Sequence, residues 1–331
     1  MRIIITGAAG FMGSHLFDLL TGQGHEVVGI DNYSIGKYKH PSIKKLDLVK
    51  DSAQVSELIL EFKPQLVYHL AAWAHEGLSQ FAPIRITENN YNAFLNTLIP
   101  SIKVGIERFL VTSSMSVYGD QNTPFDEEMK RKPVDIYAVS KTAMEEALEI
   151  LSAVHNFEYV IIRPHNVYGP RQVISDPYRN VVGIFMNRIM NKLPPIIYGD
   201  GDQTRAFSYI DDVNPYIAKA GFLKAAKNQI INIGPLENYS INFLAKNVLK
   251  AFKSKLKPIY MPDRPTEVKH AFCTNDKAQE LLGYKTSVKF EDGIEKMTEW
   301  AKQTGPQKFL YLDSLELINQ STPKTWVEKI I

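Results

Sequence analysis

One stretch decides the fold: Arg2-Ile3-Ile4-Ile5-Thr6-Gly7-Ala8-Ala9-Gly10-Phe11-Met12-Gly13. It begins with a run of branched apolar residues, which is typical of a strand buried in a parallel sheet. After this run, Gly7 permits a tight turn, Gly10 allows backbone to approach a pyrophosphate, and Gly13 allows a helix to pack closely on the sheet. The helix expected over 14–21 presents unpaired N–H groups and a positive dipole end to phosphates. The stretch therefore predicts a strand, turn and helix that bind a dinucleotide.

Asp31 follows a second expected strand, 27–30, at the distance where a carboxylate accepts both hydroxyls of a ribose. Spaced glycines by themselves also occur in ordinary turns, so it is the strand, the helix and this acid in succession that favour a dinucleotide site. A carboxylate repels a 2′-phosphate, so the expected cofactor is NAD rather than NADP. Lys37 and Lys39 lie nearby and weaken that preference slightly.

The composition excludes several classes of protein. The chain has 331 residues, enough for a large core and two lobes around one cleft. Its net charge is +2 with acids and bases interleaved, so it lacks the basic surface that binds nucleic acid. Its apolar runs are too short for a membrane span or a secretory signal. Cys273 is the only cysteine, which excludes a disulfide framework and a cysteine metal cluster. A cytoplasmic enzyme is the expected class.

Strand-like and helix-like segments alternate through the first half of the chain. Branched or aromatic runs recur at 43–46, 66–70, 109–112, 159–162 and 230–233, with helical patterns at 55–62, 93–104 and 141–153. This alternation predicts an α/β fold with a Rossmann-type doubly wound parallel sheet. Beyond Arg163, loops rich in proline and glycine dominate, and shorter helices follow at 242–252, 276–282 and 291–302. We therefore expect an NAD-binding domain over 1–165 and a smaller C-terminal substrate-binding lobe over most of 166–331, with some later segments returning to the sheet.

Tyr137 and Lys141 are spaced four apart on an expected helix, so both side chains can face the same cofactor. A phenol has a pKa of about 10 and is a poor base at neutral pH. A nearby ammonium and a positively charged nicotinamide both favour the phenolate. The run Thr112-Ser113-Ser114 ends an expected strand, and ligands gather at the carboxyl ends of strands in open parallel sheets. Tyr33 and Lys37 have the same spacing, but we interpret that pair as part of a loop without a catalytic role.

Further motifs follow in order along nearly the whole chain, to about Ala301. They are Asp31-Asn32, His69-Leu70-Ala71-Ala72, Ser113-Ser114-Met115-Ser116-Val117-Tyr118-Gly119, Tyr137 to Lys141, Arg163-Pro164-His165-Asn166-Val167-Tyr168-Gly169-Pro170-Arg171-Gln172, Gly199-Asp200-Gly201 with Arg205, and Arg264-Pro265. Together with the first glycine turn, this set resembles the extended short-chain dehydrogenases/reductases. Within that family it resembles the nucleotide-sugar epimerases and dehydratases, and most of all the UDP-glucose and UDP-N-acetylglucosamine 4-epimerases.

The resemblance implies a role for each matching residue. Ser114, Tyr137 and Lys141 would form the catalytic triad, with Tyr137 as the base. NAD would contact the catalytic Tyr137 and Lys141 together with Gly7, Gly10, Phe11, Met12, Gly13, Asp31, Asn32, Asp47, Leu48, Leu70, Ala71, Ala72 and Asn89, and Asp47 would contact adenine. The nucleotide sugar would contact Ser114, Ser116, Asn166, Arg205, Arg264, Glu267 and Ala271, with Glu267 on the ribose. Pyrophosphate needs such cations in a nearly neutral protein, although Arg205 and Arg264 could also be ordinary surface cations.

The residues after Ser114 favour one reaction within the family. Dehydratases of this family carry an acidic pair there, and the decarboxylases carry a glutamate at the second position. This chain has Met115 and Ser116, which cannot do carboxyl acid–base work. The resemblance then implies 4-epimerisation: Tyr137 takes the proton of the C4 hydroxyl, hydride passes to NAD, the 4-keto sugar rotates, and hydride returns to its other face. Ser114 would hydrogen-bond the oxygen as it becomes a carbonyl.

The resemblance also bears on the identity of the sugar. In similar 4-epimerases the position of Ala271 gates the space around the 2-substituent, so its small side chain predicts that N-acetylhexosamines are accepted alongside hexoses. The stretch 73–78 departs from the family pattern, with Ala74 in place of a lysine, and His165 stands where an aromatic residue is usual. His69 ends an apolar strand and is interpreted as structural.

Other functions stay open from the sequence alone. Within enzymes they are an NAD(P)-dependent nucleotide-sugar reductase, a 2- or 3,5-epimerase and, less favoured, a dehydratase or decarboxylase. A non-catalytic nucleotide-sensing protein on the same fold is the alternative from another class, although such proteins usually lose the Tyr/Lys pair. The expected partner is a UDP-linked sugar, in carbohydrate metabolism such as polysaccharide biosynthesis. By analogy we expect a homodimer built from the helices that start near Ala93 and Lys141, and we expect the segment 306–331 to cover the lobe or a partner subunit.

Overall fold

Seven parallel strands form the centre of the molecule in the computed structural model, which describes residues 1–331 throughout. They are β1 (Arg2–Thr6), β2 (Glu26–Asp31), β3 (Ile43–Lys45), β4 (Leu66–His69), β5 (Arg108–Thr112), β6 (Glu158–Pro164) and β11 (Gln229–Ile233). Their order in the sheet is β11-β6-β5-β4-β1-β2-β3, and every neighbouring pair is parallel. The predicted Rossmann-type doubly wound sheet is confirmed.

The strand order reverses between β1 and β4. From β1 the chain moves outward through β2 to the edge strand β3, and then returns to place β4 on the other side of β1. In open α/β sheets a ligand crevice forms at such a reversal, outside the carboxyl ends of the strands. This topology fixes where the site must lie.

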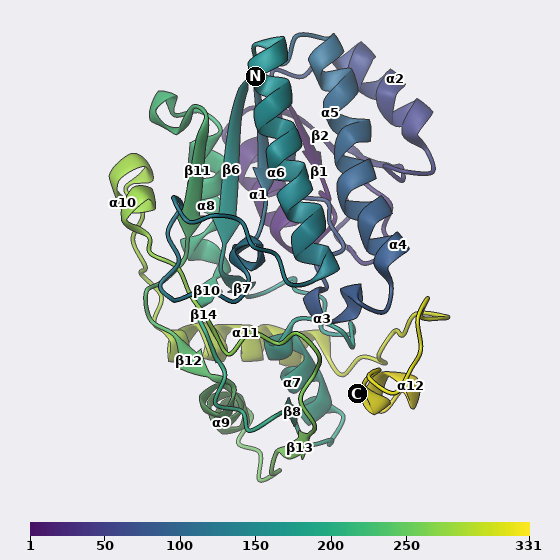
Figure 1. Cartoon of the computed structure of the whole chain (residues 1–331), viewed down its shortest axis with the longest axis vertical. Helices are drawn as coiled ribbons and strands as arrows, with labels where there is room; N and C mark the ends of the chain where they lie inside the picture. The colour runs from purple at the N-terminus through teal and green to yellow at the C-terminus, as the bar shows by residue number, and fades with distance from the viewer.

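Alternating side chains of β1 explain the layers on either side of the sheet. Ile3 and Ile5 belong to the core beneath α1 (Phe11–Gly22) and α8 (Asn214–Ala220), whereas Ile4 belongs to the core on the other face. That second face is covered by α2 (Ser52–Phe62), α5 (Ala93–Lys103) and α6 (Ile136–His155) (Figure 1). Because successive strand residues point to opposite faces, an unbroken apolar strand serves both layers.

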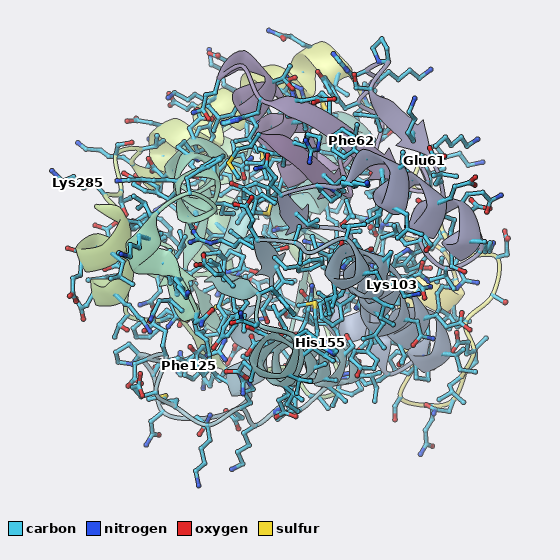
Figure 2. The ribbon with its side chains drawn as sticks, turned by 90° about the horizontal axis from the view of Figure 1, so that it is seen from above. Glu61, Phe62, Lys103, Phe125, His155 and Lys285 are labelled. Atoms are coloured by element: carbon cyan, nitrogen blue, oxygen red, sulfur yellow. The ribbon has the colours of Figure 1, made fainter.

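The helices on the second face all run the same way. Figure 2 looks down on the end of the molecule where α2, α5 and α6 finish, near Phe62, Lys103 and His155. Their N-terminal ends therefore face the carboxyl edge of the sheet, where the crevice lies. The positive ends of these helix dipoles point toward the site.

The second half of the chain builds a smaller lobe below the sheet (Figure 1). Its helices are α7 (Val181–Met190), α9 (Ile241–Ala251), α10 (Asp276–Leu282) and α11 (Phe290–Thr304). Its short strands are β7 (Asn166–Tyr168) paired with β10 (Phe207–Tyr209), β8 (Ile196–Tyr198) paired with β13 (Ile259–Met261), and β9 (Thr204–Arg205) between β12 (Tyr239–Ser240) and β14 (His270–Ala271). One core cluster of 42 buried residues runs from the sheet into this lobe, so the two parts share packing. From this half of the chain, strand β11 joins the edge of the sheet beside β6, and helix α8 packs on one face of the sheet.

The remaining elements are short and lie mostly around the crevice. They are α3 (Glu76–Ser79), α4 (Pro83–Thr87), a π-helix (Glu88–Asn92), three 3₁₀ turns (Met115–Tyr118, Ile210–Asp212 and Lys224–Ala226) and α12 (Lys324–Val327). None of the helices combines the length and the apolar character needed to cross a bilayer.

Helix α6 begins earlier than the sequence predicts, at Ile136 rather than Lys141. The Asp135 carboxylate caps it by accepting a hydrogen bond of 2.7 Å from the backbone N–H of Ala138. The cap places Tyr137 in the first turn, close to the carboxyl edge of the sheet.

The C-terminal segment, residues 306–331, connects both parts of the molecule (Figure 1, yellow). The Glu316 carboxylate accepts hydrogen bonds of 2.8 Å and 2.9 Å from the backbone N–H groups of Ile84 and Arg85, at the start of α4. On the lobe side, Arg188 of α7 donates a 2.7 Å hydrogen bond to the carbonyl of Ile330. The segment also buries Trp326 against Phe81 and Tyr178.

Candidate active site

A crevice with a cavity volume of about 400 Å³ lies between the carboxyl edge of the sheet and the lobe. The residues that line it include nearly all of those expected from the sequence. They are Gly7, Gly10, Phe11, Met12, Gly13, Asp31, Asn32, Asp47, Leu48, Leu70, Ala71, Ala72, Asn89, Ser114, Tyr137, Lys141, Asn166, Arg205, Arg264 and Glu267. Two expected residues, Ser116 and Ala271, do not line it.

The glycine turn is too tight for any other residue at two of its positions. Gly7 has a φ of 70°, in the left-handed region that favours glycine. A Cβ on Gly13 would lie 2.0 Å from the backbone oxygen of Gly7, so only glycine lets α1 approach the turn. The turn thus presents the N-terminus of α1 to the crevice, as phosphate binding requires.

Asp31 lies at the end of β2 with its carboxylate beside the turn. It accepts hydrogen bonds from the backbone N–H groups of Ala9, at 2.9 Å, and Tyr33, at 2.7 Å. Burial raises the pKa of Asp31, although these backbone bonds oppose the rise. The carboxylate is held rigidly where the ribose of a dinucleotide would meet it.

Asp47 and Asn32 form the next part of the same wall. The amide of Asn32 donates to the Asp47 carboxylate at 2.9 Å, and the backbone N–H groups of Val49 and Lys50 donate to its other oxygen. Although burial opposes it, these hydrogen bonds lower the pKa of Asp47. The glycine turn, Asp31 and Asp47 together fit the phosphates, ribose and adenine of NAD.

The three expected catalytic residues meet at the carboxyl edge of the sheet. Ser114 follows β5, while Tyr137 and Lys141 lie one turn apart on α6. The Lys141 Nζ donates a 2.7 Å hydrogen bond to the Thr112 carbonyl and lies 5.9 Å from the centre of the Tyr137 ring. Ser116 donates its hydroxyl proton to the Ser114 Oγ at 2.9 Å. Ser116 therefore orients Ser114; it does not line the crevice itself, and its predicted contact with the sugar stays a prediction.

The protonation states of this cluster differ from the expectation. Burial raises the pKa of Tyr137 well above its usual value; Arg179 and Ser114 lower it, whereas Glu76 and Asp135 raise it further. Burial also lowers the pKa of Lys141 to about 7, with Glu145 opposing this and Arg179 adding to it. Lys141 is not among the groups that lower the pKa of Tyr137, and burial disfavours the charged forms of both residues.

Arg205, Arg264 and Glu267 form a charged group on the lobe side. Glu267 accepts a 2.8 Å hydrogen bond from the Arg264 Nε and lies 3.5 Å from Arg205. Burial raises the pKa of Glu267, but the two arginines outweigh it and hold the carboxyl below its usual range. With two cations and one anion, the group keeps a net positive charge facing the crevice. Both arginines are largely buried, so neither is an ordinary surface cation.

Ala271 is not positioned as the predicted gate. It is buried in a small core with Met115, Val117 and Cys273, behind the crevice wall. It lies on β14, whose register places it beside Arg205 of β9. Met115, not Ala271, reaches the crevice from this core.

Sequence reasoning did not assign several lining residues to the site, because they belong to loops or very short helices without a recognisable motif. They are Trp73, Glu76, Asp176, Tyr178, Arg179 and Trp326. A neighbour of the expected Asn89 also matters: buried Asn90, in the π-helix, accepts the N–H of Trp73 at 2.7 Å and thereby fixes this wall. His69 bonds Thr6 at 2.9 Å, and burial lowers its pKa to about 3, which fits the structural interpretation.

Comparisons with known proteins agree with this geometry. Residues 3–234 match the NAD dependent epimerase/dehydratase family. The chain belongs to this family. It is 32% identical over 311 residues to a UDP-glucose 4-epimerase of Mycolicibacterium smegmatis, covering 91% of this chain and 98% of that relative. It is 30% identical over 323 residues to a UDP-N-acetyl-alpha-D-glucosaminuronate decarboxylase of Bacillus cytotoxicus, again covering 91% and 98%.

Its structure is similar to that of the UDP-glucose 4-epimerase of Thermus thermophilus in complex with NAD. The TM-score is 0.84 at 30% identity, with 91% of this chain and 98% of that chain covered. The resemblance to nucleotide-sugar epimerases that the motifs predict is confirmed, and so is NAD as the cofactor.

Proposed function

We propose that this chain is an isomerase that epimerises C4 of a UDP-hexose or UDP-N-acetylhexosamine through a transient 4-keto sugar. One observation carries the proposal: Ser114, Tyr137 and Lys141 meet at the crevice, while the two residues after Ser114 are Met115 and Ser116. A decarboxylase or dehydratase of this family needs a carboxyl group there, and neither side chain supplies one. The proposal follows the epimerase relatives rather than the decarboxylase.

Each catalytic residue has a distinct task in this reaction. Tyr137 takes the proton of the C4 hydroxyl and returns it to the epimer. Ser114, oriented by the hydroxyl of Ser116, donates a hydrogen bond to the oxygen at C4 as it becomes a carbonyl. Lys141 is tied to the Thr112 carbonyl, which fixes its ammonium beneath the phenol.

NAD, held by the glycine turn, Asp31 and Asp47, supplies the hydride acceptor and donor when bound, and its nicotinamide is positively charged. The protein's own groups keep the phenol protonated, because burial dominates the pKa of Tyr137. A positive charge beside the phenol favours its ionisation. The base is therefore prepared for reaction only when the oxidised cofactor is in place.

The lobe side of the crevice binds the nucleotide diphosphate in this proposal. Arg205 and Arg264 provide forked donors for phosphate oxygens. Glu267, which lies between the two guanidinium groups in the structure, accepts a hydrogen bond from a ribose hydroxyl. Asn166 lies on the same wall, where its amide donates to the Ala206 carbonyl at 3.3 Å. Residues 1–165 then act mainly on NAD and residues 166–331 mainly on the nucleotide sugar.

We further propose a homodimer and a cytoplasmic role in polysaccharide biosynthesis. Apolar side chains are exposed along the outer faces of α5 and α6, at Ile99, Val139, Ile150 and Val154. A four-helix interface between two copies would cover them. The single cysteine, Cys273, is buried and unpaired, which fits a reducing compartment.

The test is product analysis without added reductant. Protein incubated with UDP-glucose or UDP-N-acetylglucosamine is expected to yield a mixture with the C4 epimer, resolved by NMR, with no net consumption of NADH. A reductase would consume NADH in proportion to product, and a nucleotide sensor would bind UDP but convert nothing. Either result would contradict the proposal.

A further inference from the structure

Glu76 begins α3, a helix placed between two parts of the proposed site. Helix α3 packs against α6, which carries Tyr137. On its other side, a Cβ added to Gly77 would lie 3.4 Å from the Arg264 Nη1, so the first turn of α3 also abuts that guanidinium. In the proposed function the sugar lies between the phenol and the diphosphate. Glu76 therefore starts a helix next to the sugar position.

The carboxylate of Glu76 is free within this region. The residue is exposed, lines the crevice and takes part in no ion pair. Its neighbours are fixed, since buried His75 bonds the Asp176 carboxylate at 2.8 Å and Trp73 bonds Asn90. The segment thus holds an unpaired acid at a defined place on the crevice wall.

The effects of Glu76 on other groups agree with this position. Burial is the largest influence on the pKa values of Tyr137 and Arg264, raising the first and lowering the second, and the charge of Glu76 raises both. Arg179 also lines the crevice, and its charge lowers the pKa values of both Tyr137 and Lys141. Together with the packing of α3 against α6 and the contact of Gly77 with Arg264, these effects agree with a position of Glu76 between the phenol and the diphosphate-binding arginine.

We propose that Glu76 contacts the sugar ring and selects neutral hexoses over hexuronates, an inference that rests on the proposed function. A carboxylate accepts hydrogen bonds from sugar hydroxyls, whereas it repels the carboxylate of a uronic acid. Met115 and Ser116 favour epimerisation over elimination or decarboxylation, whereas Glu76 selects which sugars bind for that reaction. It acts as a specificity-determining residue and takes no proton.

The experiment compares UDP-glucose with UDP-glucuronate in three proteins: the unmodified chain, Glu76→Gln and Glu88→Gln. Glu88 is also an exposed acid in a helical segment but does not line the crevice, so its variant is the matched control. The measurements are the ratio of kcat/KM values, from NMR of the epimers, and the ratio of Kd values from calorimetry. Because the Glu76 side chain makes no internal bond, its variant is expected to fold normally, which thermal melting checks.

The unmodified chain and Glu88→Gln are expected to favour UDP-glucose over UDP-glucuronate. In Glu76→Gln we expect this preference to fall by about tenfold in both kcat/KM and Kd, because the uronate no longer meets a like charge. Unchanged ratios in Glu76→Gln, or a preference of the unmodified chain for UDP-glucuronate, would overturn the inference. Binding without turnover, with the Kd ratio still dependent on Glu76, would contradict the proposed function but support the inference. Failure to bind either sugar would overturn both.

Discussion

Tyr137 and Tyr33 each precede a lysine by four residues, but only Tyr137 lines the crevice. Tyr33 lies in the loop after β2 with a φ of 58°, and its backbone N–H is used to hold Asp31. Tyr137 instead occupies the first turn of a capped helix whose N-terminus faces the site. The same spacing of tyrosine and lysine therefore places a side chain in the site only where the backbone is a helix that starts at the crevice.

Replacing Tyr137 with Phe removes the proposed base and keeps the ring. We expect kcat for sugar epimerisation to fall by about 10²- to 10⁴-fold, the usual contribution of a positioned general base. Tyr33→Phe is the control and is expected to keep nearly full activity. Initial rates with UDP-glucose measure both, and equal activity of Tyr137→Phe and the unmodified chain would refute the assignment.

Lys141 makes stability depend on pH. Its pKa is about 7 in the folded chain and 10.5 in its ordinary environment, so the unfolded chain binds more protons between these values. The free energy of unfolding should therefore rise as pH increases from 7 toward 10. In Lys141→Met this contribution is absent, and we expect a smaller rise. Urea unfolding at pH 7, 8 and 9 gives the pH dependence of the free energy of unfolding for both proteins. The same dependence in both would contradict a lowered pKa of Lys141 in the folded chain.

At the scale of elements, α1 depends on a glycine that touches the turn. A Cβ on Gly13 would meet the Gly7 carbonyl, which is backbone and cannot turn away. We expect Gly13→Ala to lower the free energy of unfolding by about 1–3 kcal/mol, as overpacking does, and to weaken NAD binding. Urea unfolding and calorimetry measure the two effects.

Gly22, at the other end of the same helix, is the matched control. A Cβ there meets nothing within 4 Å. Gly22→Ala should leave NAD binding unchanged and raise the free energy of unfolding by about 0.5–1 kcal/mol through helix propensity. If both variants behaved alike, close packing of α1 on the turn would not be the reason for Gly13.

Elements with a strong local pattern could be predicted from the sequence. The apolar runs predicted the seven strands, and the glycine turn with Asp31 predicted one wall of the crevice, which we propose holds NAD. Boundaries were less predictable, because the start of α6 depends on the side chain of Asp135, which acts only once the loop before it is placed.

The rest of the site depends on contacts between distant segments. Ser116 turns toward Ser114, and Ala271 turns into a core with Cys273, so a motif position alone could not place either residue. Glu76, Arg179 and Trp326 reach the crevice from segments that are far apart in the sequence and carry no shared motif. Their positions in the crevice follow from the tertiary fold, which local sequence patterns do not contain.

At the scale of the whole molecule, the exposed apolar residues of α5 and α6 predict self-association. Ile150 and Val154 are 63% and 69% exposed on one helix face. We expect Ile150→Asp to shift the protein from dimer to monomer, because a buried unpaired charge opposes the interface. Leu236→Asp, in an exposed loop of the lobe, should leave the assembly unchanged. Light scattering after size exclusion measures the mass, and a monomeric unmodified chain would contradict the dimer.

The C-terminal segment also constrains how the molecule opens. Glu316 holds it to α4 beside the sheet, while Thr325 bonds Tyr198 of the lobe at 2.5 Å and Arg188 holds Ile330. Any hinge motion that parted the two halves would have to stretch this tether or detach one of its anchors. Replacing Glu316 with Gln weakens this anchor, so we expect UDP to dissociate faster in stopped-flow measurements. In that case a carboxylate far from the reacting groups limits the rate of product release.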